Sequence, residues 1–98
     1  MHARVTTLQL DPARVDEMAE NLRRDDVPGF EQLDGFKGMT VITDRDSGKT
    51  IALTFWESAE ALQASEDAVM DARRRAAETG GGSEPQVERF EVVIDTMA

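Results

Sequence analysis

The sequence predicts a single α+β domain whose elements follow the order β-α-β-β-α-β. Three observations indicate this order: short runs rich in β-branched residues, two longer segments with an apolar stripe at helical spacing, and turn-forming residues between them. The 98 residues have the length of one ordinary domain, and we expect its core to span about residues 3–94. This order is that of the split-βαβ, or ferredoxin-like, fold, in which two helices cover one face of a four-stranded antiparallel sheet.

The N-terminal third of the chain predicts a strand and a helix. Residues 3–10 are rich in Val, Thr and Leu and precede Asp11-Pro12, which predicts a strand followed by a helix with an aspartate cap and proline in its first turn. The helix has an apolar stripe at positions i, i+3, i+4 and i+7, formed by Val15, Met18, Ala19 and Leu22. We expect this helix to end at residues 24–26, before Pro28-Gly29.

A β-hairpin is predicted in the middle of the chain. Its arms are residues 35–44, GFKGMTVITD, and residues 50–56, TIALTFW, and the polar turn DRDSGK joins them. Gly35 and Gly38 in the first arm indicate a bulge or a bend. The second arm has no charged residue on either face, so we place it in the centre of the sheet.

The C-terminal half predicts a second helix and a last strand. Ser58 caps the helix and Gly80-Gly81-Gly82 ends it. Small residues dominate its apolar face, which comprises Ala61, Leu62, Ser65, Ala68, Val69, Ala72 and Ala76. The arginines at 73–75 are expected to form a solvated helix end. A loop at residues 83–85 then leads to a strand at 86–94, predicted at a sheet edge because one face is partly charged, and a tail at 95–98.

Composition excludes several classes of function. The formal net charge of -9, from 20 acidic and 11 basic residues, disfavours nucleic acid and anionic membrane surfaces as partners. Cysteine is absent and His2 is the single histidine, so disulfides, thiol chemistry and metal sites that need several imidazoles are excluded within one chain. We expect no bound metal. The chain shows neither an apolar run of membrane-spanning length nor the layout of a signal peptide, and we expect a cytoplasmic location.

The uncharged central strand also predicts a partner. One of its faces carries Ile51, Leu53 and Phe55, and the other carries Ala52, Thr54 and Trp56. Two helices cover one face of the sheet only, so the other row needs cover that the chain does not supply. We therefore expect a homodimer through the sheet faces.

Three stretches give the chain a resemblance to a known family. They are Pro28-Gly29-Phe30, Gly35-Phe36 and residues 54–62, TFWESAEAL. The sequence resembles the antibiotic biosynthesis monooxygenase (ABM) domain family, within the dimeric α+β barrel superfamily. The resemblance implies one such domain over residues 1–98, a dimer of ferredoxin-like units and a small pocket between helices and sheet in each. Some members of that family are cofactor-free oxygenases of polyketide-like aromatics, and some degrade haem.

The resemblance implies candidate functions and a candidate pocket. The first hypothesis is cofactor-free oxidation of an aromatic or quinol-like molecule; the second is a non-enzymatic dimer that binds a small apolar ligand. Haem degradation is the third and least favoured hypothesis. The haem-degrading members use a helical histidine and an asparagine, but neither predicted helix here carries a histidine, and Asn21 lies on the first helix instead of the first strand. Catalytic residues stay unassigned. Candidate pocket residues, whose alternative role is core packing, are Trp56, Phe30, Phe36 and Met18.

Overall fold

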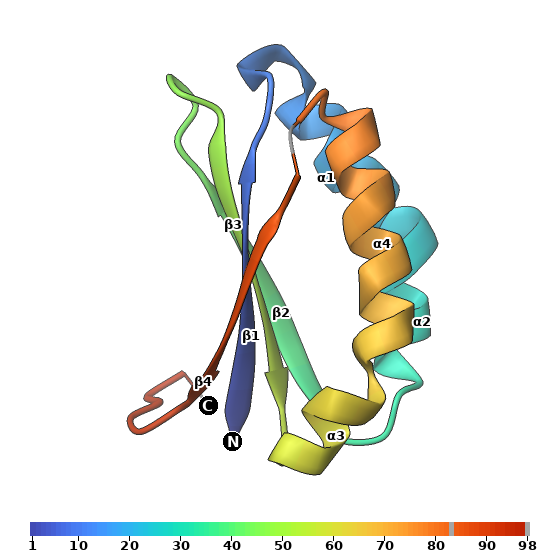
Figure 1. Ribbon diagram of the computed structural model, residues 1–98, viewed down its shortest axis with the longest axis vertical. Helices are drawn as coiled ribbons and strands as arrows, with labels where there is room; N and C mark the ends of the chain where they lie inside the picture. The colour runs from blue at the N-terminus through green and yellow to red at the C-terminus, as the bar shows by residue number, and fades with distance from the viewer. Residues whose placement is uncertain (83, 98) are drawn as a thin grey trace.

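The computed structural model describes residues 1–82 and 84–97, with strands and helices in the predicted order. Four antiparallel strands form one layer in the order β2-β3-β1-β4. The helices form a second layer along one face of this sheet, as Figure 1 shows. The predicted α+β ferredoxin-like fold is therefore confirmed. Residues 83 and 98, assigned from sequence to a loop and to the tail, lie outside the described residues.

The strands are β1 (His2–Gln9), β2 (Phe36–Thr43), β3 (Lys49–Trp56) and β4 (Gln86–Glu91). β1 and β3 are the central pair, so the prediction that residues 50–56 form a central strand is confirmed. They pair from His2 opposite Trp56 to Gln9 opposite Lys49. β4 lies at an edge as predicted, but it ends at Glu91, which pairs with His2, and not at Ile94. Just beyond the strand, the amide of Val92 donates one more hydrogen bond to the Met1 carbonyl at 2.9 Å.

Strand alternation decides which row of β3 faces the helices. Thr50, Thr54 and Trp56 point to the helix layer and are at most 4% exposed. The alternate residues Ile51, Leu53 and Phe55 are half-buried on the open face of the sheet. The row with Leu53 is therefore the one that the described helices leave uncovered.

The first helical segment is longer than predicted. Asp11 accepts a hydrogen bond from the Ala13 amide at 2.9 Å and caps a short 3-10 helix, η1 (Pro12–Arg14). The chain continues through α1 (Val15–Asn21), a π-helical turn η2 (Leu22–Asp26) and α2 (Val27–Glu31). The prediction that the helix ends before Pro28 is wrong: the amide of Val27 bonds to the carbonyl of Leu22, five residues back. Pro28 then lies in the first turn of α2, where its missing N–H removes no helical bond.

The second helical segment is divided in two. It consists of α3 (Ala59–Ala64) and α4 (Glu66–Thr79), whereas the sequence predicted one continuous helix. Ser58 caps α3 as predicted, accepting from the Ala61 amide at 3.1 Å. The division falls at Ser65, next to a carbonyl of Leu62 that accepts from the Arg4 guanidinium at 2.7 Å and from the Ser65 hydroxyl at 2.6 Å. These bonds take the carbonyl away from the regular helical pattern.

The β2–β3 hairpin contains the bulge that Gly35 and Gly38 indicated and the turn predicted between its arms. Its register shifts between Phe36 and Gly38, which confirms a bulge in the first arm. Gly48 closes the turn with φ +81°, a conformation that side chains rarely adopt. A Cβ atom at Gly48 would lie 2.0 Å from the carbonyl oxygen of Leu10.

The core lies between the sheet and the helix layer. Among the largest fully buried side chains are Trp56, Arg4, Met18 and Thr50. The buried hydrophobic cluster combines strand and helix residues, namely Leu8, Leu10, Val15, Met18, Leu22, Phe30, Trp56, Leu62, Val69, Ala72, Ala76 and Ala77. The small residues of α4 allow that helix to pack closely against the sheet. A space remains in this layer, and it forms the candidate site.

Candidate functional site

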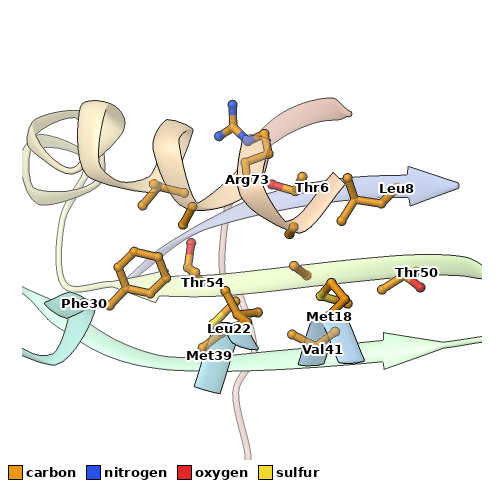
Figure 2. A pocket seen from close by; sticks show the side chains of 14 residues that line it. Thr6, Leu8, Met18, Leu22, Phe30, Met39, Val41, Thr50, Thr54 and Arg73 are labelled. Atoms are coloured by element: carbon orange, nitrogen blue, oxygen red, sulfur yellow. The ribbon is translucent and has the colours of Figure 1, made fainter. Parts of the chain in front are cut away.

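An apolar cavity lies between the helix-facing side of the sheet and helices α1, α2 and α4 (Figure 2). Its volume is about 30 Å³, room for a water molecule or two. Strands β1, β2 and β3 form its floor. Its lining comprises Thr6, Leu8, Met18, Leu22, Phe30, Met39, Val41, Thr50, Ala52, Thr54, Val69, Ala72, Arg73 and Ala76.

Three threonines supply the hydroxyl groups of this lining. The hydroxyl of Thr50 lies 2.9 Å from that of Thr43 and donates to the Gly48 carbonyl at 3.2 Å, so its hydrogen bonds are made within the hairpin. The hydroxyl of Thr54 accepts a hydrogen bond from the indole Nε1 of Trp56 at 3.0 Å. A hydroxyl has one hydrogen to donate, and among the described residues no group accepts it from Thr54. Thr54 therefore keeps one hydroxyl hydrogen without a described acceptor.

Trp56 lies behind the cavity wall. Its side chain is 0% exposed and does not line the cavity. The ring packs edge-on against Phe36, with centroids 5.3 Å apart, and Arg4 lies 5.9 Å from its ring centroid. Trp56 thus orients the Thr54 hydroxyl and fills the core around it.

The other three predicted pocket residues occupy two neighbouring places. Met18 and Phe30 line the cavity itself, the first from α1 and the second from α2. Phe36 lines a wider groove beside the cavity and contacts Phe30, with ring centroids 6.2 Å apart. Sequence reasoning did not select the threonines. The period-2 rows that place Thr6 beside Leu8 on β1, and Thr50 and Thr54 in one row of β3, are the pattern that could have indicated them.

The groove runs between α1–α2 and the edge strand β2 and has a volume of about 480 Å³. It shares Met18, Leu22, Met39 and Val41 with the cavity, so one layer of side chains separates the two spaces. At one end, Arg45 of the hairpin turn makes two hydrogen bonds to Asp16 of α1, at 2.9 and 3.0 Å. Two of the shared residues are methionines, whose unbranched side chains adapt easily to irregular spaces.

A cluster of arginines lies beside the cavity, around α4. Arg4, 1% exposed, donates to Ser65, to the Leu62 carbonyl and to Glu66, the last at 2.8 Å. Arg89 of β4 donates to the same Glu66 oxygen at 2.9 Å, and Arg73 lies 3.8 Å from the other. Burial lowers the pKa of Arg4 and of Arg73, and attraction to Glu66 counteracts this for both.

This cluster corrects one prediction from the sequence. The arginines at 73–75 were expected to form a solvated helix end, but the side chain of Arg73 is only 12% exposed. Arg74 and Arg75 are solvated as predicted, with side chains 64% and 55% exposed. The difference follows from helical spacing, because Arg73 lies one residue beyond the buried Ala72 and one turn beyond the buried Val69.

The described part of the chain carries neither a metal-binding cluster nor a membrane-spanning helix. Among the described residues, no group of three or more His, Asp or Glu side chains is placed to hold a metal ion. No helix in this part of the chain has both the length and the apolar character needed to span a bilayer.

The fold and cavity define a ferredoxin-like domain with an interior apolar site, and comparison with known proteins gives its family. The family model for antibiotic biosynthesis monooxygenases matches residues 1–79, so the chain belongs to this family. Two uncharacterized proteins of Mycobacterium tuberculosis are similar in sequence. Rv2557 is 38% identical over 92 residues, and Rv2558 is 35% identical over 94 residues. The matches cover 94% and 96% of this chain but 41% and 39% of those proteins, so the chain spans about two-fifths of their length.

Solved structures support the same fold. The ActVA-Orf6 monooxygenase of Streptomyces coelicolor, in complex with nanaomycin D, superposes with a TM-score of 0.79 at 17% identity, over 99% of this chain and 91% of that one. The haem degrader MhuD of Mycobacterium tuberculosis, with two haems bound, gives 0.75 at 19% identity, over 98% and 99%. SnoaB, a cofactor-independent oxygenase from Streptomyces nogalater, gives 0.66 at 16% identity, over 99% and 97%. At these identities the likeness concerns the fold.

Proposed function

We propose that the chain is a cofactor-independent monooxygenase that oxidises an aromatic or quinol-like small molecule in the cavity between sheet and helices. Membership of the antibiotic biosynthesis monooxygenase family supports this class of reaction. The observation that carries the proposal is the cavity itself, which is lined almost entirely by apolar groups and has the threonines Thr6 and Thr54 in its wall. Such a site excludes water and orients a flat phenol by few polar contacts.

The proposed reaction takes its electrons from the substrate. A phenol with an activated CH₂ group, such as an anthrone, loses a proton, and its anion transfers electrons to O₂. One oxygen atom becomes the new carbonyl, the other leaves as water, and the CH₂ group supplies the two hydrogens of that water. The balanced change is RCH₂R′ plus O₂ giving RC(=O)R′ plus H₂O, which needs no external reductant.

The cavity's residues define what the protein contributes. The hydroxyl hydrogen of Thr54, held in place by Trp56, would donate to the phenolate oxygen and favour the anion. None of the described residues lining the cavity carries a carboxylate or an imidazole. The proposal therefore requires a substrate that is acidic enough to lose its proton to water or before it enters the cavity.

Access requires the wall between cavity and groove to move. An apolar cavity that holds benzene measures about 150 Å³, whereas this one measures about 30 Å³. Displacement of Met18 and Met39, which border both spaces, would extend the cavity into the groove of about 480 Å³. A three-ring substrate would then lie partly in each space.

We further propose that the functional unit is a dimer in which a second copy covers the open sheet face. Ile42 and Phe90 on this face are 52% and 49% exposed, and Val93 and Ile94 beyond β4 are more than 80% exposed. Covering such surface is favourable at roughly 25 cal/mol per Å². The relatives of more than twice this length have room for a second unit of the same size, which fits a paired arrangement.

Oxygen uptake tests the reaction. The protein is mixed with dithranol, an anthrone, in buffer with a metal chelator, and O₂ consumption and quinone absorbance are followed together. We expect one O₂ per quinone formed and a rate well above that of dithranol alone. Dithranol that binds but is oxidised no faster than in buffer would contradict the enzyme and favour the non-enzymatic binding module.

Two alanines of α4 provide a matched test of the cavity. Ala72 lines the cavity and Ala68 is exposed on the same helix. Valine costs the helix about the same in either place, roughly half a kcal/mol. We expect Ala72→Val to lower the oxidation rate at least tenfold and Ala68→Val to leave it unchanged. Equal rates in both variants would place the reaction outside the cavity.

Haem degradation is tested separately. Haemin and a reductant are added to the protein, and the Soret band and the region of bile-pigment absorbance are recorded. We expect no opened-porphyrin product, because no helix in the described chain carries a histidine. Stoichiometric haem loss with a new bile-pigment band would favour the chemistry of the haem-degrading relative instead.

A further inference from the structure

Three arginines gather beside the cavity around a single carboxylate. Arg4 and Arg89 both donate to one Glu66 oxygen, at 2.8 and 2.9 Å, and Arg73 lies 3.8 Å from the other oxygen. An arginine side chain stays protonated in proteins, so the group carries three positive charges against one negative charge. The side chains of Arg4 and Arg73 are only 1% and 12% exposed. The cluster therefore keeps an excess of buried positive charge in a protein whose formal net charge is -9.

Two members of this cluster adjoin the cavity. Arg73 belongs to the cavity lining, and in Figure 2 its stem borders the cavity while its guanidinium extends away from the other labelled side chains. Arg4 of β1 lies directly opposite Thr54 of β3, another lining residue. Side chains paired in this way have Cβ atoms about 5 Å apart. Both charges therefore act on the cavity through the surrounding protein of low dielectric constant, and not by contact.

The other charges around the cavity do not cancel this excess. Among the described residues that line the cavity, Arg73 alone is charged. Asp26 of the π-helical turn is buried, but its carboxylate pairs with Arg75. His2 at the start of β1 adds to the positive charge when it is protonated. The remaining carboxylates on the surrounding elements are exposed, where water screens them; they are Asp16, Glu17, Glu20, Asp25, Glu31, Glu60, Asp67, Asp71, Glu78, Glu88 and Glu91.

We propose that this arginine cluster stabilises the anionic form of a phenol or enol bound in the cavity, so that the ligand ionises without a basic side chain. The O–H bond breaks, its electron pair stays on the oxygen, and the proton passes to water. Positive charge beside an acid lowers the pKa of that acid, which opposes the effect of burial. The hydroxyl hydrogen of Thr54 is placed to bond to the anion. The inference rests on the proposed function for the ligand, since the anion is the species that transfers electrons to O₂.

A cysteine placed in the cavity measures this effect without any ligand. The chain has no cysteine of its own, so the ultraviolet absorbance of the thiolate during a pH titration reports one group. Burial alone would raise the pKa of a thiol. We nevertheless expect the thiol of Thr54→Cys to have a lower pKa than that of Ala68→Cys, an exposed position on α4. A higher value at Thr54→Cys would overturn the proposal. Ala72→Cys, which also lines the cavity, serves as the reporter if Thr54→Cys does not fold.

Removing one arginine tests the source of the effect. The buried Nε and Nη2 atoms of Arg73 make no hydrogen bond to a described group, so Arg73→Met removes the charge and leaves none of their partners unpaired. Combined with Thr54→Cys, it should raise the thiol pKa by about one unit. Arg74→Met is the matched control, because Arg74 is the next residue of α4 and is exposed. It should shift the thiol pKa far less, and equal shifts in the two variants would refute the role of the cluster.

Dithranol titrated in the absence of O₂ connects this inference with the proposed function. The neutral and anionic forms of dithranol differ in absorbance, so a pH titration with excess protein gives the pKa of the bound molecule. We expect this pKa to lie about one unit or more below that of free dithranol, and Arg73→Met to reduce the difference. Bound dithranol that ionises at the same pH as free dithranol would overturn the inference, even if the protein oxidises it. Bound dithranol that ionises readily but is not oxidised when O₂ is admitted would overturn the proposed function instead.

Discussion

The indole Nε1 of Trp56 donates a hydrogen bond to the Thr54 hydroxyl at 3.0 Å, so the tryptophan acts on the cavity through the threonine and not by contact. The two residues are on the same face of β3, and both are buried. This arrangement leaves the threonine hydrogen for a ligand. It also makes Trp56 part of the packing between β3, Phe36 and Arg4.

Replacing Trp56 tests this arrangement. We expect Trp56→Phe to lower the free energy of unfolding by about 2 kcal/mol, because a fully buried ring is shortened and a buried hydrogen bond is lost. Urea denaturation followed by circular dichroism gives this value. Phe55→Leu, a smaller change on the open sheet face, is the control and should cost less. An unchanged midpoint for Trp56→Phe would show that Trp56 carries little of the packing.

An aspartate placed on one face of β3 should separate the subunits, and an aspartate on the other face should unfold the chain. Leu53→Asp places a charge on the open face, and we expect a folded monomer. Thr54→Asp places a charge in the helix-facing layer, where Thr54 is 4% exposed, and we expect an unfolded chain. Light scattering after size exclusion, with circular dichroism, distinguishes the outcomes.

The same measurement tests the dimer of the unmodified protein. With a formal net charge of -9 on each copy, salt screens the repulsion between them, so rising salt should tighten the dimer. A folded monomer at micromolar concentration would contradict the proposed assembly.

The ion pairs of Glu66 predict a pH dependence of stability. Burial raises the pKa of this carboxyl, but hydrogen bonds and attraction from Arg89 and Arg4 outweigh burial and leave the pKa below its ordinary value. A lowered pKa in the folded state stabilises the fold above the unfolded-state pKa, and the contribution is lost as pH falls through the folded-state pKa. We expect Glu66→Gln to cost about 2 kcal/mol at pH 7.

This difference from the unmodified protein should shrink as the pH is lowered into the acidic range, because the carboxyl then becomes neutral like the amide. Thermal unfolding of both proteins across this pH range measures it. Asp67→Asn, an exposed change beside Glu66, is the control. A difference that is constant with pH would mean that the ion pairs contribute nothing.

Two glycines predict effects of opposite sign. Gly48 has φ +81°, and a Cβ there would lie 2.0 Å from the Leu10 carbonyl oxygen, so Gly48→Ala should destabilise the protein by about 2 kcal/mol or more. Gly29 lies in α2 with nothing within 4 Å of an added Cβ. Gly29→Ala should therefore stabilise by about half a kcal/mol. Chemical denaturation of both variants checks the signs, and destabilisation by Gly29→Ala would contradict the account of α2.

Local sequence patterns were enough to predict the order of elements, the central position of residues 50–56 and the capping roles of Asp11 and Ser58. These features depend on local periodicity and on contacts between near neighbours, which a sequence displays directly. The division at Ser65 was not visible in this way, because it accompanies hydrogen bonds from Arg4, which lies far from Ser65 in the sequence.

Tertiary packing sets which row of β3 faces the helices, since both rows are uncharged and alternation alone is symmetric. It also placed Trp56 behind Thr54, and it buried Arg73 while Arg74 stayed exposed. Neighbouring helix residues differ by about 100° around the axis, so what each one meets depends on the strand or helix packed opposite. The cavity and the arginine cluster around Glu66 belong to this second kind of information, because each forms where segments distant in the sequence come together.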